Sequence, residues 1–350
     1  MQTWIVTGIS GSGRIELLED LKRHCDERGA PTMVHDVGSI LATEAKRQGL
    51  EFADSKILDV DARLLRTLRA MAIKEVRLRI LQTPPDTLHL VGIHATFRWK
   101  ERLIPGISFA DIRDLCPTGF INIVNNVKAV CERNAKNPKW DADSLPTPDQ
   151  TQDWMTEEEF ITEALAEVQG VPMFLVARTH NPSNLADLFF TTKKRIYLSY
   201  PITAVREENP ELLSRIQGEI LAQLEEHFVV FNPLAIRDMD LVTGKDLPKT
   251  IKELTASAKA AIKSRTVARD YQFIDQSDAV VVYYMTEKVS PGVLAEIYYA
   301  HRNMKEVFVC FPFPRSPFLE GATTEISNTP EEQLALLDAF AVPAGRPQSI

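Results

Sequence analysis

Glu296 and Asp278 are the two residues whose type and position point most directly to covalent chemistry. Glu296 falls within a predicted helix from Pro291 to about Asn303, beside its apolar face. A carboxylate beside a buried face costs free energy unless it has a use. The pattern therefore predicts Glu296 as a nucleophile or a base. Asp278 enters the apolar run AVVVYY, which predicts a carboxylate at a strand edge near the following loop.

The residues that precede this helix form a helix-start signal. Ser290 is predicted as the N-cap, Pro291 as the first helical residue, and Gly292 as a small residue that lets a ligand approach the helix start. Open parallel sheets bind ligands at the carboxyl ends of their strands. The joint occurrence of this signal with Glu296 and Asp278 therefore favours a binding site.

A glycine-rich loop near the N-terminus is the second group with chemical potential. It joins an apolar strand to an amphipathic helix, and its glycines are Gly8, Gly11 and Gly13. Such a loop offers backbone N–H groups to a phosphate. In a working P-loop a lysine and a magnesium-binding hydroxyl follow the last glycine. Here Arg14 could hold a phosphate, whereas Ile15 cannot ligate magnesium.

Two other interpretations of the loop remain open. It could be a turn that only packs the helix on the strand. It could also belong to a dinucleotide site in which Asp36, at the end of the next predicted strand, is the ribose-binding acid.

Alternating strand and helix patterns must position these residues. The alternation predicts an α/β fold with two parallel-sheet domains. We expect the first domain at residues 1–190, the second at residues 191–315, and a C-terminal arm at residues 316–350. The polar, Pro-rich stretch between Asn137 and Trp154 predicts an exposed loop or reduced lid, and a helix with acidic residues in its first turn follows it.

The composition excludes several classes of protein. The chain has 350 residues, with 40 Lys and Arg against 48 Asp and Glu, for a net charge of −8. This balance disfavours binding to nucleic acid or to anionic membranes. No run approaches the roughly 20 apolar residues that span a bilayer, and the four cysteines form no CxxC pair. We expect a cytoplasmic protein without a metal site or cofactor.

Residues 195 to about 312 resemble the nucleoside 2-deoxyribosyltransferase superfamily, which includes nucleoside 5′-monophosphate N-glycosidases. The resemblance lies in the segments RIYLSYPI, DYQFIDQSDAVVVYY and SPGVLAEIYYA. It implies a Rossmann-like domain and a retaining glycosyl transfer through a covalent glycosyl-enzyme, without a metal. In this chain Tyr298 stands where the family has a glycine.

The same resemblance implies a role for several residues. Glu296 would be the nucleophile, Asp278 the carboxylate that orients it or the sugar, and Tyr197 a hydroxyl near the site. The substrate-binding residues would be Ser290, Gly292, Pro201, Ile202 and Arg206. Family members that act on free nucleosides usually carry Asp at the position of Ser290, so the serine favours a 5′-phosphorylated substrate. The proton donor to the base is left open, with Asp270 and Asp275 nearby in the sequence.

Residues 3 to about 178 resemble the archaeal-type adenylate kinase family, in the glycine-rich loop and in HDVGSILATEAKRQGLEF and GIHATFRWKERLIPGIS. The chain departs from that family at Arg14 and Ile15, in residues 53–61, which lack its arginines, and in the lid, where Arg133 remains. The resemblance implies a degenerate P-loop kinase-like domain that binds a nucleotide or serves as a scaffold.

The leading hypothesis is an N-glycosidase or deoxyribosyl transferase that cleaves the bond between base and sugar of a nucleoside 5′-monophosphate. The alternatives are a non-catalytic nucleotide-binding or sensing protein, a nucleotide kinase that uses Arg14, and an NAD glycohydrolase. The expected partner is a small nucleotide substrate. The resemblance also implies a homo-oligomer.

Overall fold

The computed structural model describes residues 2–50, 57–99, 102–138, 140–141, 144–244 and 254–341. The chain forms two compact units, one of residues 1–182 with 236–265, and one of residues 183–235 with 266–350. Each unit contains a five-stranded parallel sheet, so the predicted α/β class with two parallel-sheet domains is confirmed. Residues 236–265, expected in the second domain, cluster with the first unit instead.

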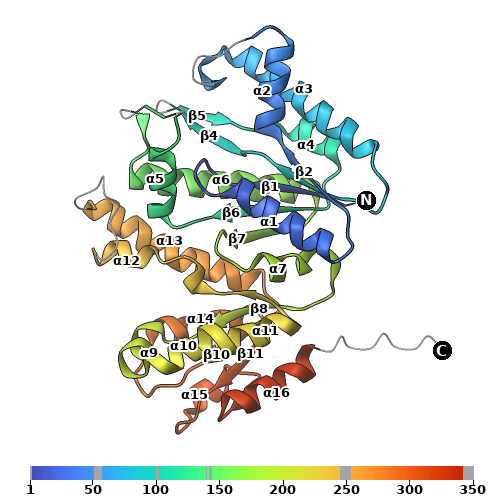
Figure 1. The fold of residues 1–350 in the computed structure, drawn as a ribbon. Helices are drawn as coiled ribbons and strands as arrows, with labels where there is room; N and C mark the ends of the chain where they lie inside the picture. Colours follow the sequence, from blue (N-terminus) through green and yellow to red (C-terminus); the bar gives the residue numbers. More distant parts are fainter. Residues whose placement is uncertain are drawn as a thin grey trace, which may run out of the picture. The chain divides into compact units, whose positions relative to one another are not determined.

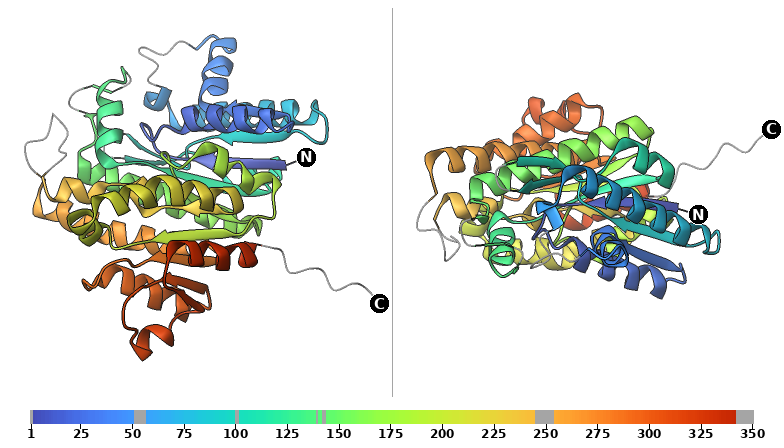
Figure 2. Two further views of the ribbon diagram at one scale, coloured as in Figure 1. Left: turned by 60° about the horizontal axis from the view of Figure 1, so that its bottom comes forward. Right: turned by 90° about the horizontal axis from the view of Figure 1, so that it is seen from above.

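The first sheet has the strand order β2-β3-β1-β6-β7 (Figure 1). Its strands are β1 (Gln2–Thr7), β2 (Thr32–Asp36), β3 (Leu88–Gly92), β6 (Gly119–Val124) and β7 (Met173–Ala177). The central strand β1 carries the N-terminus (Figure 2). The loop after β1 therefore lies between the loops that follow β3 and β6, at the edge where parallel sheets bind ligands.

Most helices of the first unit begin at a capping side chain. They are α1 (Arg14–Glu27), α2 (Val37–Arg47), α3 (Ala62–Leu81), α4 (Phe109–Leu115), α5 (Val127–Ala135) and α6 (Pro148–Gln169), and a hairpin of β4 (Thr96–Trp99) and β5 (Arg102–Pro105) follows β3. Thr147 and Gln150 form a capping box at α6. Helix α6 thus starts well before the acidic residues that were expected in its first turn, and Glu158 lies in its middle.

The segment 236–265 completes the core of the first unit. Leu241 of α12 (Asp238–Val242) and Ile262 of α13 (Ala256–Asp275) are buried in one cluster with Ile9 of the glycine-rich loop. Asp238 Oδ1 also accepts a hydrogen bond of 2.8 Å from the first backbone N–H of α5. A helix N-terminus needs such an acceptor, so a residue far along the chain caps α5.

The second sheet has the strand order β12-β11-β10-β8-β9 and is also parallel. Its strands are β8 (Arg195–Ser199), β9 (Val229–Phe231), β10 (Ala279–Tyr283), β11 (Glu306–Cys310) and β12 (Glu325–Ser327). The chain runs from β8 outward to β9 and then returns to β10 on the other side of β8, so the topological switch point lies between β8 and β10. Strand β12, expected within a separate arm, is the edge strand of this sheet.

The helices of the second unit cover this sheet. They are α8 (Asp187–Phe190), α9 (Ile202–Glu208), α10 (Pro210–Arg215), α11 (Leu221–His227), the second half of α13, α14 (Pro291–Arg302), α15 (Pro317–Glu320) and α16 (Pro330–Ala341). The helix predicted from Pro210 to about Phe228 is present, with a π-helical segment at Ile216–Ile220 between α10 and α11. Over the described parts of the chain, no helix has the length and apolarity that a membrane span requires.

Candidate functional sites

The glycine-rich loop is packed tightly against α5. Gly11 and Gly13 have φ angles of +82° and +83°, a region that favours glycine. A Cβ atom on Gly11 would lie 2.8 Å from the carbonyl oxygen of Val130 and 2.9 Å from Oδ1 of Asn134. Asn134 Nδ2 donates to the carbonyl of Ser10, and Ser10 Oγ donates to Asn134 Oδ1, each at 3.1 Å. This strand-loop-helix geometry suits an anion at the helix N-terminus.

Arg14 turns back on the loop itself. Its side chain is buried, and Nη1 donates to the carbonyl oxygens of Gly8 at 2.7 Å and of Ile93 at 3.0 Å. Its Nε is buried without a hydrogen-bond partner among the described residues. Burial lowers the pKa of the guanidinium, and the charges of Glu158 and Asp36 oppose that shift. Arg14 thus stabilises the conformation of the loop through these buried hydrogen bonds.

Glu158 is a buried carboxylate that the sequence analysis did not single out. Its Oε1 accepts from the backbone N–H groups of Gly8 at 3.0 Å and Ala95 at 2.8 Å, and its Oε2 accepts from the N–H and hydroxyl of Thr96 at 2.6 and 2.8 Å. Burial raises its pKa, whereas these hydrogen bonds lower it. Glu158 therefore ties the glycine-rich loop to the connection after β3. Its place in an acidic run on a helix hides this role.

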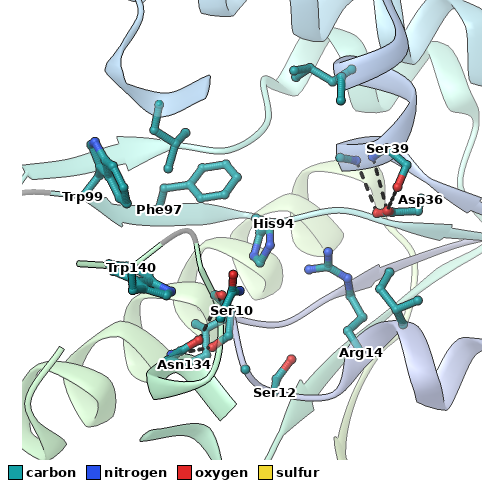
Figure 3. A pocket seen from close by; sticks show the side chains of 18 of the residues that line it. Ser10, Ser12, Arg14, Asp36, Ser39, His94, Phe97, Trp99, Asn134 and Trp140 are labelled. Atoms are coloured by element: carbon teal, nitrogen blue, oxygen red, sulfur yellow. Dashed lines mark hydrogen bonds between the residues drawn. The ribbon is translucent and has the colours of Figure 1, made fainter. Parts of the chain in front are cut away.

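A cavity of about 860 Å³ opens at the glycine-rich loop. Figure 3 shows Phe97, Trp99 and Trp140 on one side of it and Arg14 on the other, with His94 between them. The ring centroids of Trp99 and Trp140 are 5.3 Å apart. Such a cavity has the size and the mixture of aromatic and polar groups typical of small-molecule sites.

Basic side chains outnumber acidic ones around this cavity, although the whole chain is acidic. The charged lining residues are Arg14, Lys46, Arg69, Arg98, Arg133 and Lys136 against Glu16 and Asp36. Arg133 forms an ion pair with Glu16, and Asp36 caps α2 by accepting from the N–H groups of Gly38 and Ser39. Of residues 53–61, where the adenylate kinase family carries the arginines that this chain lacks, residues 53–56 lie outside the described residues, and Asp59 accepts a hydrogen bond of 2.7 Å from Trp99 Nε1. The cavity suits an anion with an aromatic ring.

The positions that hold Mg²⁺ in P-loop proteins carry residues that do not fit the metal. P-loop enzymes use a hydroxyl after the loop lysine and an acidic residue at the end of a neighbouring strand. Here Ile15 lines the cavity, and Gly92 ends β3 beside Val6 of β1. A Cβ on Gly92 would meet Leu18 Cδ1 at 2.7 Å and Arg14 Nε at 3.4 Å, so that space is filled. In the described ranges no group of three or more His, Cys, Asp or Glu could hold a metal ion.

The second site forms around Glu296, where the switch point of the second sheet lies. Tyr197 and Ser199, on the same face of β8, donate to the two carboxylate oxygens of Glu296 on α14, the tyrosine hydroxyl at 2.9 Å. Tyr197 and Ser199 are fully buried, whereas Glu296 is only partly so. The structure thus brings Tyr197 to Glu296, as the resemblance implied, and adds Ser199.

The Glu296 carboxyl group is poised to change protonation near neutral pH. Burial raises its pKa to about 7, the hydrogen bond from Ser199 opposes this rise, and the charge of Asp270 adds to it. Asp270 lies on α13, where the partly buried carboxylate accepts two hydrogen bonds from Arg269. Asp270 is therefore the second acidic group of this site. A carboxyl group with such a pKa can act as a nucleophile or exchange a proton.

Asp278 does not join this site. It directly precedes β10, and its carboxylate accepts from the backbone N–H of Arg195 at 2.7 Å and from the guanidinium of Arg195 at 2.7 and 3.1 Å. These residues lie at the amino ends of β10 and β8, whereas Ser199 lies at the carboxyl end of β8. The first and last residues of a five-residue strand are roughly 13 Å apart. The expectation that Asp278 orients the nucleophile or the sugar is therefore wrong, and Asp278 anchors two strands.

The expected substrate-binding residues are only partly explained by the structure. Ser290 is the N-cap position of α14, but its hydroxyl makes no capping hydrogen bond. A Cβ on Gly292 would meet open space. Pro201 is buried ahead of α9, Ile202 packs against the core of the second unit, and Arg206 is exposed. Among the described residues, no hydrogen bond or ion pair joins any of these five side chains to Glu296. Their roles stay predictions.

Comparison with known proteins finds similarity to kinases in the N-terminal part of the chain. Residues 7–146 match the family model described as an AAA domain. Adenylate kinases of Saccharolobus islandicus (strain M.14.25) and Saccharolobus solfataricus are each 23% identical over 137 residues, which is 39% of this chain and 70% of the relative. Shikimate kinase from Acinetobacter baumannii in complex with shikimate aligns at 11% identity with a TM-score of 0.35, over 54% of this chain and 90% of that one.

The first unit is therefore an α/β domain with a glycine-rich loop, and its sequence is similar to that of adenylate kinases. The family model covers the glycine-rich loop and most residues that line the cavity. The resemblance of the second unit to nucleoside deoxyribosyltransferases stays a prediction.

Proposed function

From a first unit similar to nucleotide kinases, we propose that the protein acts on nucleotides through two sites. The first unit binds a nucleotide in its basic, aromatic cavity. The second unit cleaves the N-glycosidic bond of a nucleoside 5′-monophosphate, with Glu296 as the nucleophile. The observation that carries this enzymatic proposal is the Glu296 carboxyl group, held through both oxygens by Tyr197 and Ser199 at a topological switch point.

The proposed reaction is the one that the resemblance implies, with the residues of this site in its roles. One carboxylate oxygen of Glu296 attacks C1′ of the sugar, the bond between C1′ and the base nitrogen breaks, and the base leaves with its electron pair and takes up a proton. Water then attacks C1′ of the glycosyl ester and releases the carboxylate. Tyr197 and Ser199 orient the nucleophile throughout. Asp270, whose pKa burial raises, is the nearest candidate to exchange the proton.

A nucleotide kinase is the second candidate function, and the similarity to adenylate kinases favours it. The residues at the phosphate-binding loop oppose it. Arg14 donates to backbone carbonyls, Ile15 offers no hydroxyl, and Gly92 offers no carboxylate. We therefore assign nucleotide binding, rather than phosphoryl transfer, to the first unit.

The test is incubation of the purified protein with nucleoside 5′-monophosphates, free nucleosides and NAD, followed by chromatography of the released base. We expect base release from monophosphates that Glu296→Gln abolishes. The matched control is Glu320→Gln, an exposed glutamate of the same unit, which should keep full activity. Base release that survives Glu296→Gln rejects the glycosidase, and free nicotinamide from NAD alone identifies a glycohydrolase instead.

A parallel assay with ATP, Mg²⁺ and monophosphates measures phosphoryl transfer. Transfer that requires Arg14 would establish the kinase in place of the binding role. The expected homo-oligomer is tested by mass measurement over a dilution series. The cytoplasmic location remains a prediction. So does the choice of water, rather than a second base, as the group that attacks the glycosyl ester.

A further inference from the structure

The cavity of the first unit holds fixed protein cations in the region where a P-loop enzyme arranges its metal. Ile15 and Gly92 have lost the two kinds of oxygen ligand that Mg²⁺ prefers. The place next to Gly92 is taken by the side chains of Leu18 and Arg14. An Asp at position 92 would therefore need these side chains to move before it could hold a metal.

Arg14 and Arg69 are the cations that the structure leaves partly unsatisfied. Each lines the cavity, and each has a buried guanidinium nitrogen, Nε of Arg14 and Nη2 of Arg69, without a hydrogen-bond partner among the described residues. Buried donors are usually paired. Arg69 extends from α3, donates from Nη1 to the carbonyl of Pro105, and lies 5.5 Å from the ring centroid of Phe97. Burial lowers its pKa to about 10, so it remains charged at neutral pH.

Together these features indicate a site that already contains the positive charge its ligand needs. Six basic side chains and two acidic ones line the cavity. Two of the arginines are already ion-paired, Arg98 with Glu157 and Arg133 with Glu16. We therefore expect the ligand's counter-charges to come from Arg14 and Arg69. Mg²⁺ normally neutralises the phosphates of a nucleotide in a P-loop. In this cavity Mg²⁺ would add positive charge next to arginine side chains, at a place where the two usual side-chain oxygen ligands for the metal are missing.

We propose that the first unit binds its nucleotide as a metal-free anion, with Arg14 and Arg69 as counter-charges to the phosphates and the aromatic cluster of Phe97, Trp99 and Trp140 against the base. This inference rests on the nucleotide binding proposed above. It differs from that proposal in its prediction for Mg²⁺. A P-loop kinase binds the metal complex of its nucleotide, whereas this cavity binds the free nucleotide.

The tryptophans supply a direct measurement of binding. Trp99, Trp140 and Trp154 line the cavity, whereas the remaining one, Trp4, packs in the sheet with its ring 6.0 Å from that of Phe174. In a Trp4→Phe variant the fluorescence reports on the cavity alone. ATP, ADP, AMP and inorganic tripolyphosphate are titrated into the full chain, once with EDTA and once with millimolar MgCl₂. We expect quenching by the nucleotides with the same or a tighter dissociation constant in EDTA.

Two variants and a matched control make the test more specific. Arg69→Gln should weaken nucleotide binding about tenfold or more, the typical effect of losing a hydrogen bond to a charged group. Arg66→Gln, an exposed arginine on the same helix, is the matched control and should bind as before. Ile15→Thr, at a partly exposed position, restores the hydroxyl without disturbing the core. It should gain no response to Mg²⁺, because Gly92 supplies no carboxylate.

Tighter binding by tenfold or more in MgCl₂ would overturn the metal-free inference while leaving nucleotide binding in place. Equal affinities of Arg69→Gln and Arg66→Gln would remove Arg69 from the site. Quenching by tripolyphosphate equal to that by ATP would reject the contact between the base and the aromatic cluster. An absence of quenching by every nucleotide in both buffers would instead reject nucleotide binding, and with it the inference. Circular dichroism of each variant confirms that the fold is retained.

Discussion

The protonation of Glu296 is the property most open to a quantitative test. Tyr197→Phe and Ser199→Ala each remove one hydrogen bond to the carboxylate. Because these bonds stabilise the charged form, their loss must raise the pKa of Glu296. A hydrogen bond to a charged group contributes about 1.5 to 3 kcal/mol. With about 1.4 kcal/mol for each pKa unit, either variant should move the pKa from about 7 upward by about one to two units.

The assay is a pH titration of protein labelled with ¹³C at the glutamate carboxyl, followed by NMR. The signal that vanishes in Glu296→Gln belongs to Glu296. Its midpoint should lie near 7 in the parent protein and higher in both variants. The rising limb of base release against pH should move by the same amount, because the nucleophile must be ionised. A parent midpoint near 4.5, or midpoints that the variants leave unchanged, would refute the description of this site.

The raised pKa of Glu296 also predicts how the free energy of unfolding changes with pH. Its pKa is higher in the folded chain than the ordinary value of 4.5. The stability that it contributes is therefore complete below about pH 4.5 and is lost as the pH rises through 7. Glu296→Gln should change the free energy of unfolding by under about 1 kcal/mol at pH 5 and raise it by about 3 kcal/mol at pH 8. Urea unfolding at the two pH values measures this difference, and a gain confined to pH 5 would contradict it.

Three further predictions concern the first unit. Burial, the neighbouring His89 and then Arg79 lower the pKa of His35 from 6.5 to about 4. The stability that His35 contributes should therefore be full above pH 6.5 and fall by about 3 kcal/mol as the pH drops to 4. Urea unfolding of the parent protein against His35→Gln measures this contribution, and a difference between the two that stays constant with pH would contradict it. Glu158→Gln places an amide group against N–H donors and should lower the free energy of unfolding by about 3 kcal/mol or more in the same assay. The control Glu163→Gln, on the exposed side of α6, should lower it by under about 0.5 kcal/mol. Ile262→Ala should cost about 2 to 5 kcal/mol because its side chain is 2% exposed, and a loss below 1 kcal/mol would mean that α13 is not part of this core.

The sequence predicted local features well, because their signals are local. The strand, glycine-rich loop and helix around Gly8 to Arg14 are present as expected. The proposed role of Glu296 came from its position on a helix face, and it stays a prediction. Tyr197 was placed by resemblance to a family.

What the sequence did not predict depends on long-range pairing. Asp278 was misplaced because a residue that enters a strand lies at the opposite edge of a parallel sheet from the loop that follows. Glu158 was not singled out from the sequence, and only the packing of α6 shows its four donors. The cavity tryptophans come from separate segments, and no spacing joins them. The partners of Asp238 in α5 lie more than a hundred residues away.

The return of residues 236–265 to the first unit also has a consequence for how the protein is made on the ribosome. The nascent chain can pair all five strands of the first sheet once residue 182 has emerged, yet Leu241, Ile262 and the cap at Asp238 come later. At about 5 to 20 residues per second, the remaining stretch of about 80 residues takes roughly 4 to 16 seconds to synthesise. During that interval the apolar surface formed by Ile9 and Trp154 lacks the residues of α12 and α13 that later cover it. A stalled or truncated chain that ends near residue 190 would therefore display this apolar surface to chaperones, and only continued elongation covers it.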